Sequence, residues 1–444
     1  MAEAVTELPI VANARALPLP GAAPWLVDLR DRGLDAFEDQ GLPGRKTEAW
    51  KYTRIDALMK KTAYVPAPLT ADPVLSAIPC ELALGCEGHR LVLVNGRFSP
   101  DLSNLDALPR GVTVQSLATA LETDPQAVEP YLGRLQPLES YPFAALNTGL
   151  MGDGLVIRVK DGALIEMPLH VVSVAHAPDG VPVAFHPRLL VLIGKGAVAT
   201  LLESHVGVDG GETLSNGVTE ISVGDDAVFH HYKVQNESPT ATHLAAAQVV
   251  VGAKAVYESF ALSFGARLSR HDIRVCLDGE GAEARVNGAY AADTGQHMDT
   301  SSFIDHALPH GTSAQTYKGV VDGSGRGVFQ GRINVRRAAQ GTNGHQLHKA
   351  LLLSRKAEVD AKPELTIFAD DVQCSHGATC GQLDDDHMFF LRARGLNEEE
   401  ARGLLIEGFL DDVIDMVFAE AVKAAMKDMV HAWLLNRSSR KEGA

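Results

Sequence analysis

Two residues in the segment 368–383 have side chains that bind metals. Cys374 and His376 are two positions apart within residues 365–376, which we predict to form a strand. Side chains two apart in a strand point to the same face, so the thiol and the imidazole are expected side by side. A thiolate beside an imidazole suits zinc or iron. Four-coordinate metals need more ligands, so distant residues or another chain must complete such a site.

The same pair also has a purely structural interpretation. Free cysteine is among the most buried residue types and commonly packs as a small hydrophobe. The spacing of Cys374 and Cys380 matches neither a zinc ribbon nor a thioredoxin-like motif. We interpret Cys380 as a packing residue, and the spacing of Cys374 and His376 leaves both packing and metal binding open.

The composition bounds the class of protein. The 444 residues suffice for two or three domains, and 45% hydrophobic with 22% charged residues is ordinary for a globular protein. No apolar run approaches the ~18 residues of a membrane span, and the first residues lack the pattern of a signal peptide. Five cysteines do not make a disulfide framework. We therefore expect a reduced, cytoplasmic protein.

Charge and missing motifs exclude several functions. A formal net charge of −16 argues against nucleic-acid binding, which requires clustered Lys and Arg, and favours a basic protein partner. The sequence contains no P-loop, no His-Glu-x-x-His and no Gly-x-Ser-x-Gly motif. His345 and His348 are interpreted as solvated polar residues. No pair of nucleophile and base can be nominated, so we expect no enzyme activity.

Glycine-containing turns recur through the middle of the chain. Most end in an alanine, and these alanines are roughly 30 residues apart; they are Ala163, Ala197, Ala227, Ala255 and Ala282. Turns ending at Gly327 and Ala357 have the same shape, although the step from Ala282 to Gly327 is longer. Such a repeat of strands and tight turns predicts a mainly β, stacked solenoid. The runner-up is a β-sandwich, which requires more closely spaced strands.

Helical segments are expected at both ends of this solenoid, where they can protect its exposed strand edges. We predict an N-terminal helical domain at 1–88, a β-helix core at 89–383 and a C-terminal helical domain at 384–444. The first includes a helix over 25–39. The last includes helices over 384–394, from Asn397 to an interruption at Gly408, and over 411–435. Residues 362–365 are expected to form a turn before the Cys374 strand.

Four motifs resemble segments of one known family. They are Leu42–Thr53, Val94–Phe98, Asp370–Thr379 and Phe389–Gly395. On these motifs the chain resembles the SufB/SufD family of iron–sulfur cluster assembly proteins, and the SufD branch more closely than the SufB branch. The third is the most specific, because SufD proteins carry Cys-Ser-His-Gly-Ala-Thr where SufB proteins carry a Glu-His-Glu-Ala-Thr version.

The resemblance implies a fold and a set of partners. The family fold is a right-handed parallel β-helix flanked by N- and C-terminal helical domains. A SufB-like paralogue would pair with this chain through the β-helices, and a SufC-like ATPase would dock on the C-terminal helices of each, giving a SufB–SufC2–SufD complex. The residues carried over to ATPase docking are Phe389, Phe390, Arg392, Arg394, Leu404 and Phe409.

The resemblance also implies a cargo. The complex would be a scaffold on which a nascent iron–sulfur cluster forms, and this chain would support iron acquisition. His376 would bind iron at the SufB interface with Cys374 beside it, so that iron and cluster are transient and shared, with none bound tightly by the isolated chain. Reduced flavin on the complex and a homodimer of the isolated chain are left open. No nucleic acid and no membrane are expected.

A β-helix polysaccharide lyase or hydrolase is the competing hypothesis. Such enzymes typically work outside the cytosol and need a groove of clustered acids and bases. The missing signal peptide and the acidic balance of the chain count against it.

Overall fold

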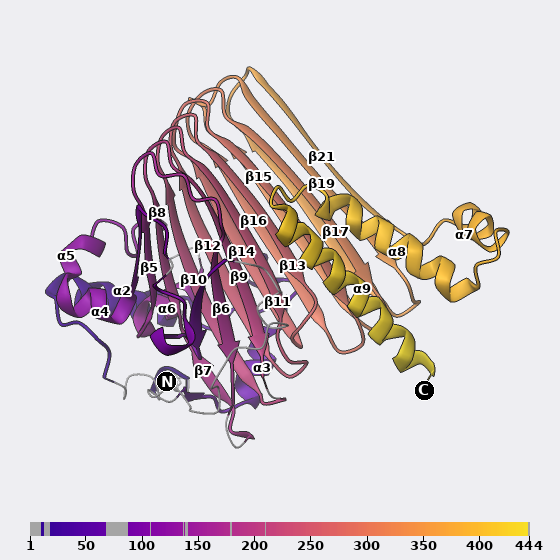
Figure 1. Ribbon diagram of the computed structural model, residues 1–444, viewed down its shortest axis with the longest axis horizontal. Helices are drawn as coiled ribbons and strands as arrows, with labels where there is room; N and C mark the ends of the chain where they lie inside the picture. The colour runs from indigo at the N-terminus through magenta and orange to yellow at the C-terminus, as the bar shows by residue number, and fades with distance from the viewer. Residues whose placement is uncertain are drawn as a thin grey trace.

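Two parallel sheets form the body of the protein, which is described here from a computed structural model (Figure 1). The structure describes residues 10–12, 18–67, 88–106, 108–135, 137, 141–177, 180–208 and 210–442. The chain passes from one sheet to the other at each corner and makes about eight turns of a β-solenoid. The predicted mainly β solenoid with helices at both termini is confirmed.

From β8 onward, the first sheet, sheet A, contains the even-numbered strands. Its order within the described residues is β20-β18-β16-β14-β12-β10-β8-β5-β4. The bounds are β4 Val112–Ser116, β5 Gly154–Val159, β8 Arg188–Ile193, β10 Thr213–Val223, β12 Thr242–Val251, β14 Leu268–Leu277, β16 His297–His306, β18 Arg326–Val335 and β20 Glu358–Ile367. The short strands β1 (Val65–Pro66) and β7 (Val183–Phe185) extend it at the side.

The second sheet, sheet B, contains the odd-numbered strands from β9 onward, and its order within the described residues is β21-β19-β17-β15-β13-β11-β9-β6-β2-β3. The bounds are β2 His89–Val94, β3 Arg97–Ser99, β6 Leu169–Ala175, β9 Val198–Gly207, β11 Val228–Asn236, β13 Val256–Ser263, β15 Glu283–Ala292, β17 Thr312–Val321, β19 Thr342–Leu352 and β21 Val372–Gly381. Consecutive turns of the solenoid therefore stack strand on strand without a break.

The repeat seen in the sequence marks one corner of this solenoid, but only as far as Ala282. Ala197, Ala227, Ala255 and Ala282 all end the turn that leads from sheet A to sheet B, and all are completely buried. The turns ending at Gly327 and Ala357 lead from sheet B back to sheet A, so they belong to the opposite corner. The step from Ala282 to Gly327 is thus about one and a half repeats, and the stacking of the strands continues unchanged through it.

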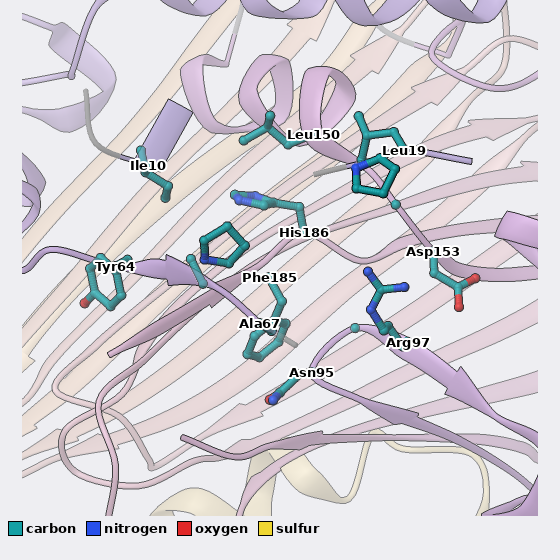
Figure 2. A pocket seen from close by; sticks show the side chains of 15 residues that line it. Ile10, Leu19, Tyr64, Ala67, Asn95, Arg97, Leu150, Asp153, Phe185 and His186 are labelled. Carbon is teal, nitrogen blue, oxygen red and sulfur yellow. The ribbon is translucent and has the colours of Figure 1, made fainter. Parts of the chain in front are cut away.

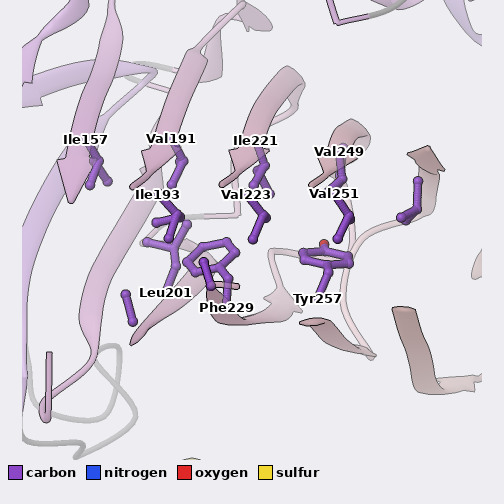
Figure 3. Packing of buried hydrophobic residues seen from close by; sticks show 14 of the residues in the cluster. Ile157, Val191, Ile193, Leu201, Ile221, Val223, Phe229, Val249, Val251 and Tyr257 are labelled. Carbon is purple, nitrogen blue, oxygen red and sulfur yellow. The ribbon is translucent and has the colours of Figure 1, made fainter. Parts of the chain in front are cut away.

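The space between the sheets is filled by ladders of like residues. Ile157, Val191, Ile221 and Val249 are register partners on successive strands of sheet A, and Figure 3 shows them in one row above Phe229 and Tyr257 of sheet B. All of these side chains are buried. Each turn of the solenoid buries its apolar face against the turns before and after it, so the core is continuous.

N-terminal helices cover the outer face of sheet A. Helices α2 (Pro24–Gln40) and α6 (Pro142–Leu150) pack together, and α3 (Ile55–Lys61) follows the family motif at residues 42–53. In this motif Trp50 is buried and lies under the Arg270 guanidinium, 4.0 Å from the ring centroid. Smaller helices α4 (Leu117–Thr123) and α5 (Pro125–Val128) lie near β5.

C-terminal helices cover the outer face of sheet B. Helices α8 (Glu398–Ile414) and α9 (Glu420–Glu442) lie across β11 to β17 (Figure 1). Their buried residues, including Ile406, Leu410 and Val413, share one cluster with Tyr232 and Phe260 of the sheet. Gly408 was predicted to interrupt a helix, but α8 continues through it because this buried face holds the helix together; the break falls at 415–419 instead.

The C-terminal strands and the first C-terminal helix also differ from expectation. Residues 362–365 were predicted to be a turn but lie inside β20, and the predicted strand 365–376 is divided by a turn at 368–371. Helix α7 spans Asp385–Arg392, with Asp384 as its cap. The proposed domain limits at 88/89 and 383/384 stay a prediction.

Candidate site at the open end of the solenoid

Cys374 and His376 lie on β21, the last strand of sheet B. Within the described part of the chain, β21 has one neighbour, β19, with which it pairs in parallel register. The last strand of sheet A, β20, pairs within the same residues only with β18. Among the described residues, no strand or helix closes this end, so the solenoid ends in two free edges and the predicted site residues lie on one of them (Figure 1).

The thiol of Cys374 faces the interior of the solenoid at this open end. It packs against a buried cluster that includes Ile333, Val335 and Ala339, and its register partner on β19 is Gly344. Partial burial raises the pKa of the Cys374 thiol, and a hydrogen bond with the backbone of Gly344 opposes this in part. The free thiol is therefore mainly protonated at neutral pH, and a bound cation would have to displace the proton.

His376 shares the inward face with Cys374, as the two-residue spacing predicted, but it is exposed. Its register partner is Gln346, which is buried. Within the described part of the chain, no third His, Cys, Asp or Glu joins this pair in a group that could hold a metal ion. A four-coordinate site here would therefore need ligands from outside the described residues.

Cys380 lies on the same inward face of β21. It is exposed, and its register partner is Ala350. Burial of part of the side chain, followed by the nearby Asp360, raises the pKa of its thiol. The expected packing role remains a prediction, and the structure adds that this third polar side chain faces the same open end.

The backbone of β21 offers hydrogen-bonding groups to the free edge. Alternate residues of a parallel strand bond to opposite neighbours. Asn343, the register partner of Gln373, bonds back toward β17 through its N–H to Gly311. By the same alternation, the N–H and C=O groups of Cys374, His376 and Ala378 point away from β19. This edge is a template for an added strand.

Two histidines of β19 lie near the site in different ways. His345 and His348 are three apart, and because β19 is a strand they lie on opposite faces. His345 is exposed and hydrogen-bonds Ser375 of β21, with 2.7 Å between Nδ1 and Oγ. His348 was expected to be solvated, but it is buried, stacks on Phe329 at 4.9 Å and contacts the Tyr290 hydroxyl. The two-residue alternation of a strand, rather than helical spacing, would have placed it correctly.

A groove lies between helix α7, the start of α8 and the turn that leads into β20. Its volume is about 1010 Å³, and its lining includes Phe389, Arg392 and Arg402. None of the residues of α7 is buried, and Figure 1 shows this helix standing away from the sheets. A helix of this length is not stable on its own in water, so a partner surface is the expected environment of α7.

The residues predicted to bind the ATPase divide into three groups. Phe389 is 75% exposed in the groove with Arg392. Phe390 is 52% exposed and lies under Arg394, whose guanidinium is 3.3 Å from the ring centroid. Leu404 is also exposed, whereas Phe409 packs against β17, where Lys318 donates to its carbonyl at 2.9 Å. The structure thus places both Phe–Arg pairs and Leu404 at the free surface and turns Phe409 inward.

The sequence did not reveal a second cluster of ionisable residues inside the solenoid. Glu203 contacts His231 at 2.7 Å, and Glu237 contacts His243 at 2.7 Å. Lys233 is buried close by, and burial lowers its pKa to about 8. Burial acts to raise the pKa of Glu237, but the nearby His243 outweighs this and holds it at about 2. His231 and Lys233 of β11, like Glu203 and His205 of β9, are two positions apart and so share one strand face, and that spacing was the available signal.

A pocket near the N-terminal helices is lined by Tyr64, Asn95, Arg97, Asp153 and His186, among others (Figure 2). The polar groups that line it are engaged in the fold. Asn95 exchanges hydrogen bonds with the backbone of His176, and Asp153 accepts from the Phe98 N–H and from Ser116. We assign no binding role to this pocket.

The comparisons with known proteins agree with the motifs. Residues 174–409 match the family described as SUF system FeS cluster assembly, SufBD core domain, and residues 12–171 match the SufBD protein N-terminal region. The chain belongs to the SufBD family. This confirms the resemblance drawn from the motifs, and it places the chain among proteins of iron–sulfur cluster assembly.

Individual relatives cover nearly the whole chain. An iron–sulfur cluster assembly SufBD family protein of Synechocystis sp. is 33% identical over 91% of this chain and 90% of its own length. The iron–sulfur cluster assembly protein SufD of Escherichia coli is 31% identical over 86% and 87%, respectively. Protein ABCI7 of Arabidopsis thaliana, a chloroplastic protein, is 30% identical over 89% and 83%. None of the described helices is long and apolar enough to span a bilayer.

Proposed function

We propose that this chain is a SufD-like, non-enzymatic scaffold subunit of a cytoplasmic complex that assembles iron–sulfur clusters. A SufB-like paralogue adds to the open end of the solenoid, and a SufC-like ATPase docks on the C-terminal helices, as a SufB–SufC2–SufD complex. The observation that carries the proposal is the free edge of β21, which bears Cys374 and His376 and has no second neighbour among the residues that the structure describes.

Pairing at this edge would complete the metal site. An added strand would hydrogen-bond the outward-pointing backbone groups of Cys374 and His376, and its side chains would supply the ligands that the described residues lack. Iron and the nascent cluster are then cargo shared between two subunits, which is why neither is held tightly by one chain. His376 is the preferred iron ligand because it is exposed, while the raised pKa of Cys374 disfavours its thiolate.

Co-expression with the SufB-like and SufC-like partners tests this function. We expect all three chains to co-purify. His376→Ala should leave assembly intact but lower the iron content and cluster yield of the purified complex, measured by metal analysis and visible absorption. His345→Ala, which alters an exposed histidine on the outer face of the neighbouring strand, is the matched control. Unchanged iron in the His376 variant would remove that residue from the site.

The docking of the ATPase is supported by the groove and by the exposed α7. Point substitutions suit the test better than truncation, because α8 and α9 bury the outer face of sheet B and their removal would uncover it. Phe389→Ala should reduce co-purification of the ATPase while the SufB-like partner still binds. Val27→Ala, an exposed apolar residue on α2, is the control. Equal ATPase recovery in both variants would argue against docking at α7.

Reduced flavin on the complex and a homodimer of the isolated chain belong to the same proposal. A second copy of the chain has the same two free edges, so it can occupy the open end when the paralogue is absent. Light scattering of the isolated chain, before and after addition of the SufB-like partner, distinguishes the two assemblies.

A polyuronate lyase or hydrolase remains the alternative, and no observation favours it. The ionisable residues that the structure gathers, such as Glu203, His231 and Lys233, are buried between the sheets rather than lining a groove. A lyase assay on polygalacturonate should give no product.

A further inference from the structure

The residue directly below His376 in the solenoid is Gln346 of β19. The two are register partners in a parallel pair, so their Cβ atoms are about 4.8 Å apart and point to the same face. Gln346 in turn lies above Gln315 of β17, its own register partner. An inward ladder Gln315–Gln346–His376 therefore leads to the open end.

The carboxamide of Gln346 is buried without a hydrogen-bond partner. The residue is 3% exposed, and neither Nε2 nor Oε1 is hydrogen-bonded. Gln315, one turn deeper, differs at its oxygen: its Nε2 is also without a partner, but its Oε1 accepts from the Ser302 hydroxyl at 2.5 Å. A buried amide with no partner costs about 1–3 kcal/mol, so such a group calls for a functional explanation.

The opposite sheet is shaped to accommodate this amide. Gly331 of β18 lies across the interior, and a Cβ added there would be 1.3 Å from Gln346 Nε2. The absence of a side chain at Gly331 thus leaves the space into which the Gln346 carboxamide extends. The register partner of Gly331 on the last strand of sheet A is Pro363. Gln346, which extends toward Gly331, therefore lies in the interior one turn below the terminal turn.

A histidine that binds a metal through one ring nitrogen usually donates the N–H of the other to a fixed acceptor. Among the groups on its own ladder, His376 has the Gln346 carboxamide as its nearest inward neighbour. Because the two residues are register neighbours, a hydrogen bond from a ring N–H of His376 to Oε1 of Gln346 would require only side-chain rotation, and it would leave the second ring nitrogen free.

We propose that Gln346 is a positioning residue for His376: its carboxamide oxygen accepts the inward ring N–H, fixes the tautomer and frees the other nitrogen for iron. The inference rests on the proposed function, in which His376 binds iron at the partner interface. It adds a residue that acts through His376 and contacts no cargo itself, and it explains why a buried amide is left without a partner.

The tautomer of His376 can be measured without metal. In the full chain labelled with ¹⁵N-histidine, the His376 signal is assigned by its loss in His376→Ala. We expect one dominant tautomer in the unmodified chain and a mixture in Gln346→Leu, whose side chain has similar volume but no acceptor. Gln346→Glu keeps an acceptor oxygen and should restore the single tautomer. The control is Gln315→Leu, which changes the same residue type one turn deeper on the same ladder and should have no effect.

A second variant moves the amide without replacing it. Gly331→Ala places a methyl group where the Gln346 Nε2 lies, so the end of this flexible side chain must move, and Phe329 Cζ, 2.9 Å from the added Cβ, must shift slightly. It should also yield mixed tautomers of His376. A single tautomer in both Gln346→Leu and Gly331→Ala would overturn the proposal.

Measurements of Fe²⁺ binding distinguish a failure of this inference from a failure of the proposed function on which it rests. In the complex with its partners, Gln346→Leu should weaken binding of Fe²⁺ by about tenfold to a hundredfold, with Gln346→Glu close to the unmodified chain. If His376→Ala leaves Fe²⁺ binding unchanged, the proposed iron site is wrong, whereas the tautomer measurement still decides the role of Gln346. If His376→Ala abolishes binding and Gln346→Leu does not weaken it, Gln346 has no positioning role.

Discussion

The two ends of the solenoid are completed in different ways. At the N-terminal end, sheet A finishes with β4 antiparallel to β5, and sheet B finishes with the β2–β3 hairpin, which places β3 antiparallel to β2. Helices α4 and α5 pack beside this end. At the C-terminal end, β20 and β21 are long parallel strands whose outer edges have no partner among the described residues. One end is closed by the chain itself and the other is left available.

The difference shows where the protein can grow by strand addition. Exposed strand edges invite pairing, and proteins normally protect them with short strands, bulges or covering helices. β3 and β4 are short, whereas β20 and β21 both span ten residues. The long free edges, with a thiol and an imidazole on one of them, are therefore interpreted as an interface rather than an unprotected surface.

The largest expected effect comes from blocking the open edge. Ala378→Pro removes an N–H that points away from β19, so the ladder within the chain keeps its hydrogen bonds while strand addition is prevented. We expect the isolated chain to fold normally and its pairing with the SufB-like partner to fall by more than about a hundredfold, since several hydrogen bonds and their packing are lost together.

The closed end provides the control for this substitution. Leu164 is an exposed apolar residue in the loop between β5 and β6. Leu164→Glu should leave pairing unchanged in the same pull-down and calorimetry. If Ala378→Pro pairs as well as Leu164→Glu does, the open edge is not the interface.

An effect on folding stability rather than on pairing is expected where the N-terminal motif is anchored. Arg270 is buried against the Trp50 ring and pairs with Asp272 at 2.7 Å and with Asp299. Arg270→Ala leaves two buried carboxylates uncompensated and should lower the free energy of unfolding by about 3–5 kcal/mol. Urea unfolding followed by circular dichroism measures this change.

The same motif also contacts the last turn of the solenoid, because Glu48 pairs with Lys362 of β20 at 2.6 Å. This pair is at the surface and screened by solvent, so Lys362→Ala should not change the urea midpoint measurably. Equal destabilisation by Arg270→Ala and Lys362→Ala would show that the motif is held as firmly at the open end as over the middle of sheet A.

A further effect is a loss of stability on acidification, which follows from the buried histidines of the interior. Burial lowers the pKa of His170, His186, His243, His306 and His348 to about 4. The unfolded chain binds protons on these residues below about pH 6.5, and the folded chain does so only near pH 4, so stability must fall as the pH falls between these values.

One such histidine contributes about 2 kcal/mol between pH 7 and pH 5, and urea unfolding at the two pH values should show at least that loss. His306→Asn should reduce the loss. A stability that is flat from pH 7 to pH 5 would contradict the burial of these residues.

The class of fold could be predicted from the sequence because the glycine turns mark the corners. The corner at which each turn lies could not be predicted, since from Gly327 onward turns of similar composition occur on the other side of the solenoid. Pro363 indicated a turn, yet it lies in a strand, because an edge strand tolerates a missing N–H on its free side. Gly408 indicated a helix break, yet the buried face of α8 outweighed the cost of one glycine.

The candidate site was predictable in part. The spacing of Cys374 and His376 correctly placed both on one strand face. Gln346 could not be found from spacing, because its relation to His376 depends on which strand stacks on which, and the register of parallel strands is set by packing over the whole turn. The interior cluster around Glu203 was missed for the same reason.

The contact between Glu48 and Lys362 joins residues 314 positions apart in the chain. On a ribosome that adds at most about 20 residues per second, the motif at residues 42–53 must therefore wait at least about 15 s for its last binding surface to emerge. The residues that pack on Trp50, among them Phe143 and Arg270, emerge earlier than Lys362. The last contact of the N-terminal segment is thus a late event in biogenesis, made only once β20 has been synthesised.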